Sequence, residues 1–190
     1  KKLLLSILLG TAALGLQAQT YCTPSYTTGC NVGDDIDDVY IGSFQDTGTG
    51  CTSSFYNVQT SDTVFIQQTA PTAISFTSNY FTQYFAVWID FNDDGDFDDS
   101  GEHLWSSPTN AWSTTTGSIT IPSTVSLGSY RLRVRSNYSA AITAAQSCSS
   151  FTYGEVHDYT TTITAPPACP APVFASLIAT DTTATLSWTS

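Results

Sequence analysis

Positive charge is scarce in this chain. Five Lys and Arg residues stand against sixteen Asp and Glu, which gives a formal net charge of −11 at pH 7. Lysine occurs only at positions 1 and 2, and the other basic residues are Arg131, Arg133 and Arg135. Binding to nucleic acid or to an anionic lipid surface needs basic patches. Neither is therefore expected as a function of this protein.

Histidine is scarce as well, and the cysteines are widely spaced. The two histidines are His103 and His157, without a His-Glu-x-x-His motif, and the five cysteines include no Cys-x-x-Cys pair. These absences argue against a zinc or thiol redox site. His157 stands next to Asp158 like a base beside its orienting acid, but adjacent residues of a strand point to opposite faces. We therefore predict that this segment is not an enzyme.

The chain has one long apolar run, at its beginning. Residues 1–18 contain two lysines, an apolar stretch from Leu3 to Leu16 and a small-residue cleavage site ending at Ala18. This order is typical of a secretory signal peptide. The run is short for a membrane span, and no second one follows. We predict a secreted or cell-surface protein that starts at Gln19, does not insert into the membrane, and carries a net charge of −13 from three Arg and sixteen acids.

Export allows disulfides to form. Four of the five cysteines, Cys22, Cys30, Cys51 and Cys148, fall within one predicted domain and can make two bridges. Three connectivities are possible, and the sequence does not choose among them. Cys169 follows in a proline-rich segment, and we expect it to be unpaired.

Abundant Thr, Ser, Tyr and Phe with few charges predict an all-β protein, an antiparallel β-sandwich of the jelly-roll or immunoglobulin-like kind. Residues 140–146 are a weak candidate for one helical turn. In residues 129–135 the three arginines alternate with Tyr130, Leu132 and Val134. The arginine face either lies in solvent or balances acids on neighbouring strands and loops. The predicted strands are residues 63–67, 73–77, 83–89, 118–121, 129–137 and 156–163.

The composition divides the chain into a domain at residues 19–163, a proline-rich linker at 164–172 and a short C-terminal piece at 173–190. The last piece has a strand, a turn at Asp181 and a second strand ending near Trp188. It resembles the first two strands of a fibronectin type III domain, with Trp188 as the core tryptophan. Two strands cannot build a core, so we expect this chain to be the N-terminal part of a longer protein.

The acidic segment from Asp90 to Glu102 reads DFNDDGDFDDSGE and holds seven acids in thirteen positions. Its start fits the calcium-loop pattern D-x-[DN]-x-[DN]-G, in which alternate oxygen ligands surround a hard cation. The glutamate comes one residue later than in the helix-loop-helix form, and residues 84–89 before the loop are typical of a strand. We predict a calcium loop between strands; the alternative is a solvated acidic loop without metal. The predicted ligands are Asp90, Asn92, Asp94, the carbonyl of Asp96, Asp98 and Glu102.

The segment Tyr153–Tyr159 reads YGEVHDY and resembles the signature G-E-V-E-D-Y of the GEVED domain, with His157 in place of the second glutamate. Further similar segments precede the signature in the expected order, at residues 21–22, 36–44, 87–95, 128–134 and 148. The resemblance covers about residues 21–163. It implies a β-sandwich module of secreted, multidomain bacterial proteins, common in Bacteroidetes, which often also carry a peptidase or another catalytic unit.

For Glu155 and Asp158 two roles remain open: ligands of calcium or of a second ion, or structural partners of arginines and turns. Trp105 and Trp112 either form an aromatic platform for sugar or belong to the core. Paired carboxylates would suit a glycan hydrolase, but the acids here have metal-loop spacing.

The expected function is thus a secreted, non-catalytic calcium-binding module, for adhesion or ligand binding, whose partner is an unknown extracellular protein or glycan. The alternative is an accessory domain of a secreted enzyme, most plausibly a peptidase, whose catalytic domain lies outside this chain.

Overall fold

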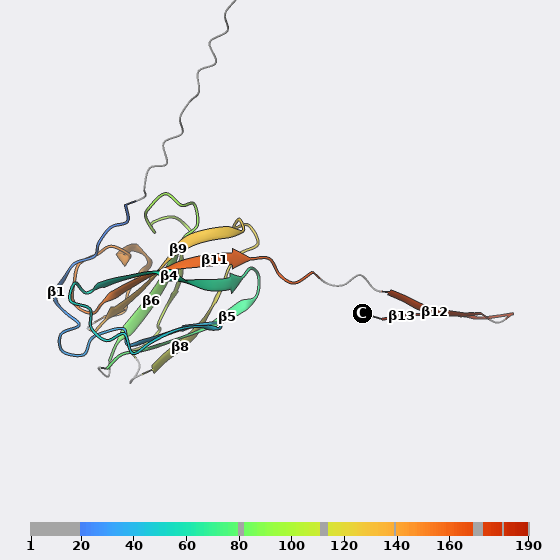
Figure 1. Cartoon of the computed structure of the whole chain (residues 1–190), viewed down its shortest axis with the longest axis horizontal. Helices are drawn as coiled ribbons and strands as arrows, with labels where there is room; N and C mark the ends of the chain where they lie inside the picture. Colours follow the sequence, from blue (N-terminus) through green and yellow to red (C-terminus); the bar gives the residue numbers. More distant parts are fainter. Residues whose placement is uncertain are drawn as a thin grey trace, which may run out of the picture.

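Two β-sheets packed face to face form the main domain (Figure 1). The computed structural model describes residues 20–79, 82–110, 114–138, 140–168, 173–179 and 181–189. The larger sheet has the order β4 (Tyr56–Gln67), β11 (Val156–Thr164), β9 (Gly128–Asn137), β6 (Tyr84–Asp90) and β7 (His103–Ser106). The smaller sheet has the order β3 (Phe44–Thr47), β2 (Asp38–Ile41), β5 (Pro71–Thr77) and β8 (Thr114–Thr120). A separate pair joins β1 (Tyr26–Gly29) to β10 (Phe151–Tyr153).

The all-β prediction is confirmed, and each of the six predicted strands lies largely or wholly within a strand of the structure. The β-sandwich is confirmed, with two parallel pairings among its antiparallel ones. Strand β11 pairs with β4 in parallel, and β10 pairs with β1 in parallel. Parallel neighbours need a long crossover connection. Here that connection is most of the domain, because strands β5 to β10 lie between β4 and β11 in the chain.

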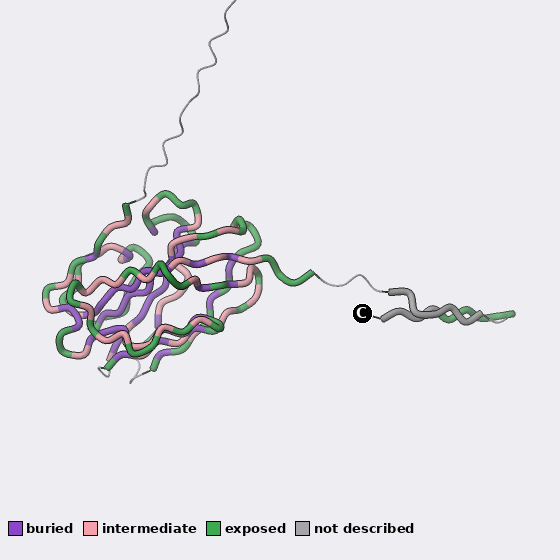
Figure 2. Tube along the Cα trace, viewed as in Figure 1, coloured by how far each residue is buried: buried purple, intermediate pink, exposed green. Residues whose placement is uncertain are grey.

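The core lies between the two sheets, where Figure 2 shows the buried segments together. Strand β6 is buried on both faces. Its residues Phe85, Val87 and Ile89 belong to the main core, while Trp88 belongs to a second buried cluster with Phe97. This explains why residues 84–89 form a continuous apolar run without a polar face. The remaining members of the main core are Ile36, Val39, Ile41, Val64, Ile66, Ile74, Phe76, Ile119, Ile121, Leu132, Val134, Tyr159 and Ile163.

The second cluster shows that the outer face of the larger sheet is also covered. The cover includes the acidic loop, which supplies Phe97, and the segment between β9 and β10, which supplies Ile142. That segment contains the 3-10 helix η1 (Ala144–Gln146), which is shorter than the helical turn predicted for residues 140–146. The indole Nε1 of Trp88 donates to the carbonyl of Ala144 at 3.0 Å and ties the cover to the sheet.

The C-terminal piece forms an antiparallel hairpin of β12 (Val173–Ala179) and β13 (Ala184–Thr189), as the sequence predicts. Residues 165–168 of the predicted linker are exposed. The predicted signal peptide, Trp112 and Cys169 lie outside the described residues. Within the described part of the chain, no helix has the length and apolar character needed to span a membrane.

Candidate functional site

The acidic loop begins at Asp90, the last residue of β6, whose side chain is fully buried. One carboxylate oxygen, Oδ1, accepts the backbone N–H groups of Asp93 at 2.7 Å and Asp94 at 3.3 Å. The other, Oδ2, accepts the N–H of Gly95 at 3.0 Å and the hydroxyl of Tyr21 at 2.8 Å. A carboxylate offers about four acceptor positions, and these four donors fill them. Asp90 therefore fixes the shape of the loop from inside.

Glu102 fixes the shape of the loop at its other end. Its side chain is buried, Oε1 accepts the backbone N–H of Phe91 at 2.8 Å, and Oε2 accepts that of Asp99 at 3.3 Å. Burial raises the pKa of Glu102 above its usual range. Both predicted end ligands, Asp90 and Glu102, thus bind the backbone of the loop.

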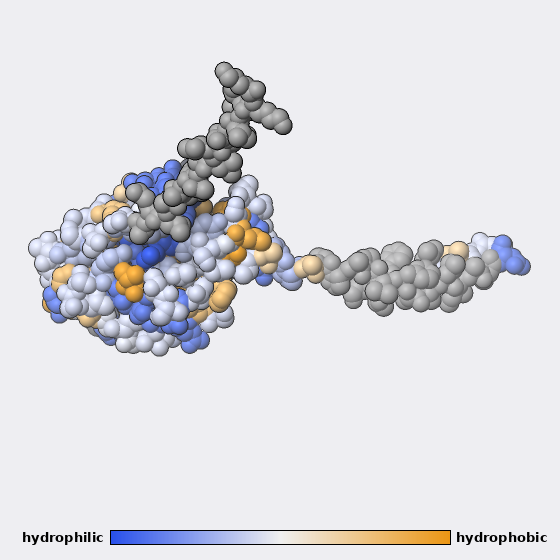
Figure 3. Space-filling view, turned by 45° about the horizontal axis from the view of Figure 1, so that its top comes forward, coloured by the Kyte–Doolittle hydropathy of each residue, from blue (hydrophilic) through white to orange (hydrophobic). Residues whose placement is uncertain are grey.

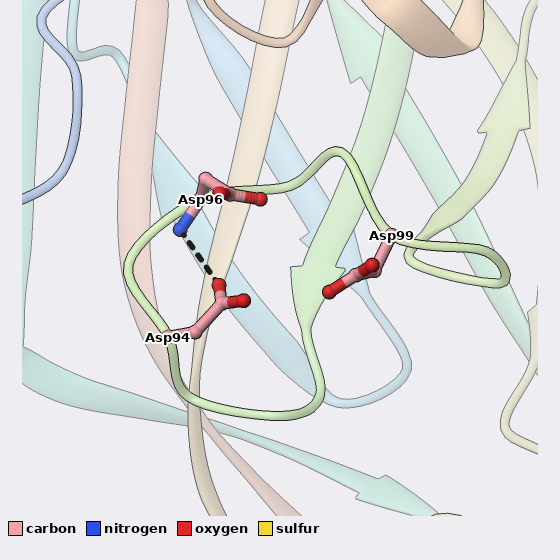
Figure 4. A group of neighbouring side chains, drawn as sticks. All are labelled: Asp94, Asp96 and Asp99. Atoms are coloured by element: carbon pink, nitrogen blue, oxygen red, sulfur yellow. Dashed lines mark hydrogen bonds between the residues drawn. The ribbon is translucent and has the colours of Figure 1, made fainter.

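Three exposed carboxylates gather within the loop, those of Asp94, Asp96 and Asp99. Their ligand oxygens all lie within 4.8 Å of one another, and Figure 4 shows Asp94 and Asp99 turned toward a shared opening with Asp96 beside them. Oxygens that bind one calcium ion at about 2.3–2.6 Å can be up to about 5.2 Å apart. The group is therefore compact enough to share a cation. Without one, three like charges at this distance repel each other.

Two further polar residues of the loop, Asn92 and Asp98, lie near the three carboxylates. The Asn92 amide nitrogen donates to Asp94 at 2.9 Å and to Asp99 at 2.6 Å. Its Nδ2 and Oδ1 positions are interchangeable by a rotation of the amide, so Asn92 can also present its oxygen to a cation. Asp98 turns away from the group, because its Oδ1 accepts the hydroxyl of Ser147 at 3.2 Å.

The structure therefore brings the carboxylate of Asp94, which the sequence analysis named, together with those of Asp96 and Asp99. For Asp96 the sequence analysis expected the carbonyl and not the side chain, and it did not name Asp99. The one irregularity of the loop pattern that the sequence shows is the late position of Glu102. Among the described residues, the three aspartates are the one group of three or more His, Cys, Asp or Glu side chains close enough to share an ion.

The second polar centre lies at Glu155, which directly precedes β11 and is fully buried. Its Oε2 accepts the backbone N–H of Ile36 at 3.1 Å, and Oε1 accepts the N–H and hydroxyl of Thr52 at 2.8 and 2.6 Å. Burial alone would raise the pKa of this carboxyl, but the nearby His157 imidazole, 3.4 Å away, and the hydrogen bonds from Thr52 and Ile36 outweigh it and hold the pKa below its usual range. Glu155 thereby joins two distant loops to β11.

His157 and Tyr159 continue the same face of β11. Nδ1 of His157 lies 2.9 Å from the hydroxyl of Tyr159, and Nε2 lies 3.4 Å from Oε2 of Glu155. The Tyr159 hydroxyl donates to Asp46 at 3.0 Å. Glu155, His157 and Tyr159 are all fully buried, so substrate has no access to this imidazole. His157 does not pair with Asp158, in agreement with the alternation of strand faces.

Asp158 lies on the outer face of β11, opposite Arg133 of β9. Arg133 donates from Nε to Oδ1 at 2.7 Å and from Nη2 to Oδ2 at 2.8 Å, and the Tyr56 hydroxyl donates to Oδ2 at 2.6 Å. Arg133 and Arg135 are fully buried. The second interpretation of the arginine row is therefore correct for Arg133, and the solvent interpretation is wrong for both buried arginines. Glu155 and Asp158 both have structural partners and lie outside the three-aspartate group.

Two disulfides fix the connectivity that the sequence left open. They join Cys22 to Cys148 and Cys30 to Cys51, with Cα–Cα distances of 6.0 and 5.3 Å. The first bridge covers the arginine row, since Arg133 also donates to the carbonyl of Cys22 at 2.9 Å.

Of the two roles left open for Trp105, the structure supports the core role. This side chain packs against the main core and lies beside Phe76, with ring centroids 5.9 Å apart. The face of the molecule in Figure 3 is mostly polar, with small, separate apolar patches.

Residues 84–162 match the GEVED domain family. No curated protein matches the chain. The matched range contains the acidic loop, the arginine row and the strand of Glu155 and Asp158, and it supports the resemblance seen in the sequence. Strands β1 to β5 precede the matched range, yet β4 pairs with β11 in the same sheet. GEVED domains are non-catalytic accessory modules, in agreement with the prediction that this segment is not an enzyme.

Proposed function

We propose that this GEVED module binds calcium through the group of Asp94, Asp96 and Asp99, and that it is a non-catalytic ligand-binding or adhesion module of an exported protein. The observation that carries the calcium proposal is the convergence of these three carboxylates within one loop. Carboxylate oxygens on a tightly turned loop are the ligands that calcium prefers.

The loop suits calcium in number and kind of ligands. Calcium takes six to eight oxygens. Asp94, Asp96 and Asp99 supply at least three, and the Asn92 amide, loop carbonyls and water are available for the others. The three aspartates are exposed, so water competes with them for the ion. The expected affinity is that of extracellular calcium modules, with a Kd on the order of 10⁻⁴ to 10⁻³ M.

The ion would stabilise more than the loop itself. Tyr21 donates to Asp90, and its ring lies 5.4 Å from that of Phe97 and 4.7 Å from the guanidinium of Arg131. Tyr21 is also next in the chain to Cys22, whose disulfide holds the cover of the outer face. An ion that orders the loop thus favours the packing of the N-terminal segment and of the arginine row beneath it.

The setting outside the cell is supported by separate features. Two disulfides fit an oxidising compartment, and residues 1–18 have the composition of a signal peptide. The resemblance also allows the module to accompany a secreted enzyme. The sequence of the full-length protein distinguishes this role, since a catalytic motif beyond residue 190 would place the module beside an enzyme.

Calorimetry tests the calcium proposal. The chain from Gln19 is freed of metal with a chelator and titrated with calcium, and one saturable site is expected. Asp94→Ala is expected to abolish the heat. Asp62→Ala is the matched control, because it removes one exposed acid from β4 and should leave binding unchanged. A metal-free protein that shows neither heat nor a change in melting temperature with calcium would contradict the proposal.

A further inference from the structure

A pocket of about 240 Å³ lies apart from the acidic loop and is lined by Val32, Asp34, Tyr138 and Tyr153. Val32 and Asp34 belong to the loop after β1, Tyr138 directly follows β9, and Tyr153 ends β10. Nothing in the calcium proposal involves these residues. The pocket is small, so it can hold a single side chain better than an oligosaccharide.

Two tyrosine rings form one side of this pocket. Tyr138 and Tyr153 pack edge to face, with ring centroids 5.7 Å apart and an interplanar angle of 80°. Tyr138 is 37 % exposed, and Val32 beside it is 58 % exposed. Exposed aromatic rings attract cations through the negative potential of their faces. These rings are therefore suited to contact a guanidinium or an ammonium group.

Asp34 adds a buried carboxylate to the same pocket. The residue is 2 % exposed, and its Oδ1 accepts Nε2 of Gln83 at 2.5 Å. The Oε1 atom of the same Gln83 amide is buried and has no hydrogen-bond partner in the described part of the chain. Burial raises the pKa of Asp34 above its usual range. Of these two residues, Asp34 lines the pocket, and Gln83 is its buried hydrogen-bond partner.

Asp34 differs from Asp158 in that no ion pair of the described residues involves it. Asp158 is neutralised by Arg133, and the described ion pairs of the domain involve Asp158 and Glu155 but not Asp34. The adjacent Asp35 is engaged by Asn79, whose backbone and amide nitrogens lie 2.9 and 2.7 Å from its carboxylate. A buried charge is unfavourable unless it is paired. A cation that entered the pocket would relieve that penalty.

We propose that this pocket receives a basic side chain of a partner protein, with its charge against Asp34 and its apolar part on the rings of Tyr138 and Tyr153. The net charge of the chain supports this choice of partner. With three arginines against sixteen acids after residue 18, the chain attracts basic proteins and repels acidic ones. The partner surface is therefore basic, and one arginine or lysine is its anchor.

NMR titration of the chain from Gln19 tests the proposal. The probe is acetyl-Gly-Arg-Gly-amide, and the matched neutral probe carries citrulline in place of arginine; a lysine peptide compares the two cations. We expect saturable shifts of the Tyr138 and Tyr153 ring signals with the arginine peptide and at least about tenfold weaker binding of the citrulline peptide, as for a lost charged hydrogen bond. Equal binding of the two would overturn the proposal, as would shifts confined to other residues.

Variants test whether the carboxylate of Asp34 is the charge that binds the arginine peptide. Asp34→Asn keeps an oxygen that can accept the hydrogen bond of Gln83. It is expected to weaken binding of the arginine peptide about tenfold or more. Asp62→Asn removes the same charge from an exposed site on β4 and should leave the affinity unchanged; an equal loss would mean unspecific attraction and reject the pocket. If Asp34→Asn lowers the melting temperature too far for titration, Tyr153→Leu is the second variant. It is expected to bind the arginine peptide more weakly, and unchanged affinity would reject the pocket.

Discussion

Arg133 and Asp158 form a fully buried, two-point ion pair between the adjacent strands β9 and β11. The two residues are direct register partners, their nitrogen–oxygen distances are 2.7 and 2.8 Å, and both side chains are 0 % exposed. Arg133 also donates to the carbonyls of Cys22 and Ser147. The pair thus connects the sheet to both segments that the first disulfide joins. The arginine row is a scaffold beneath the outer layer of the domain.

Asp158→Asn is expected to destabilise the domain by about 3–5 kcal/mol, because it leaves the buried charge of Arg133 without its counter-ion. Urea unfolding of the chain from Gln19 measures the loss. Arg131→Gln is the control: Arg131 lies 3.9 Å from Asp158 and is partly exposed, so its loss should be clearly smaller than that of Asp158→Asn. Similar losses in both variants would show that the two-point pair has no special role.

Glu155 should make the stability of the domain depend on acid pH. Its native pKa is held below the ordinary value by the nearby His157 imidazole and by the hydrogen bonds from Thr52 and Ile36, which together outweigh burial. The stabilisation is therefore complete above the unfolded pKa of about 4.3 and is lost as the pH falls through the lower native pKa. Denaturant unfolding between pH 7 and pH 3 measures this loss.

Glu155→Gln is the matched variant. The amide presents an N–H to a backbone N–H, so about 1.5–3 kcal/mol should be lost at pH 7, and the fall below pH 4.5 should become smaller. Asp181→Asn, in the turn between β12 and β13, should leave the profile unchanged. If Glu155→Gln kept the full acid dependence, other carboxyls would be responsible.

The strands that the sequence predicted well are those whose pattern is decided by the core. Residues 129–137 alternate because Leu132 and Val134 face the main core, and β6 reads as apolar throughout because both its faces are covered. Strands β1, β2, β3, β7 and β10 have three or four residues each, too few to show a period. The parallel pairing of β11 with β4 could not be predicted from the sequence. An alternating pattern shows which face of a strand is buried, but not which strands lie beside it.

The candidate site, like the strands, could be predicted only in part from the sequence. Spacing identified the acidic loop, but which acids turn inward depends on contacts made elsewhere, such as the bond of Asp98 to Ser147. Alternation placed the arginines on one face without showing that a disulfide-linked layer covers it. Glu155 finds its partners Ile36 and Thr52 more than one hundred residues away, and no local pattern indicates contacts over that distance.

Both disulfides can be checked by alkylation. The structure pairs Cys22 with Cys148 and Cys30 with Cys51, so Cys169 is the fifth cysteine. Iodoacetamide is expected to add one group to the unfolded, unreduced chain, on Cys169, and five groups after reduction. Peptide mapping without reduction should recover the two linked pairs. Two or more labels before reduction would contradict the pairing.

The choice between Asp98 and Asp99 gives the sharpest test of the calcium loop. The two residues are neighbours and both are acids of the same loop, but only Asp99 belongs to the group with Asp94 and Asp96 in the described structure. Calcium that binds the native state raises the melting temperature by mass action. Asp99→Asn is therefore expected to abolish most of the calcium-induced shift, while Asp98→Asn should keep it, although both remove one negative charge.

The measurement is a thermal melt of chelator-treated protein with and without about 5 mM calcium, above the Kd expected for an extracellular module. In the absence of calcium, Asp99→Asn should melt no lower than the parent protein, because it relieves repulsion among the three carboxylates. Equal loss of the shift in both variants would mean that the calcium-induced rise in melting temperature depends on the total charge of the loop and not on a particular ligand. Loss in Asp98→Asn alone would restore the ligand set expected from the sequence and remove Asp99 from it.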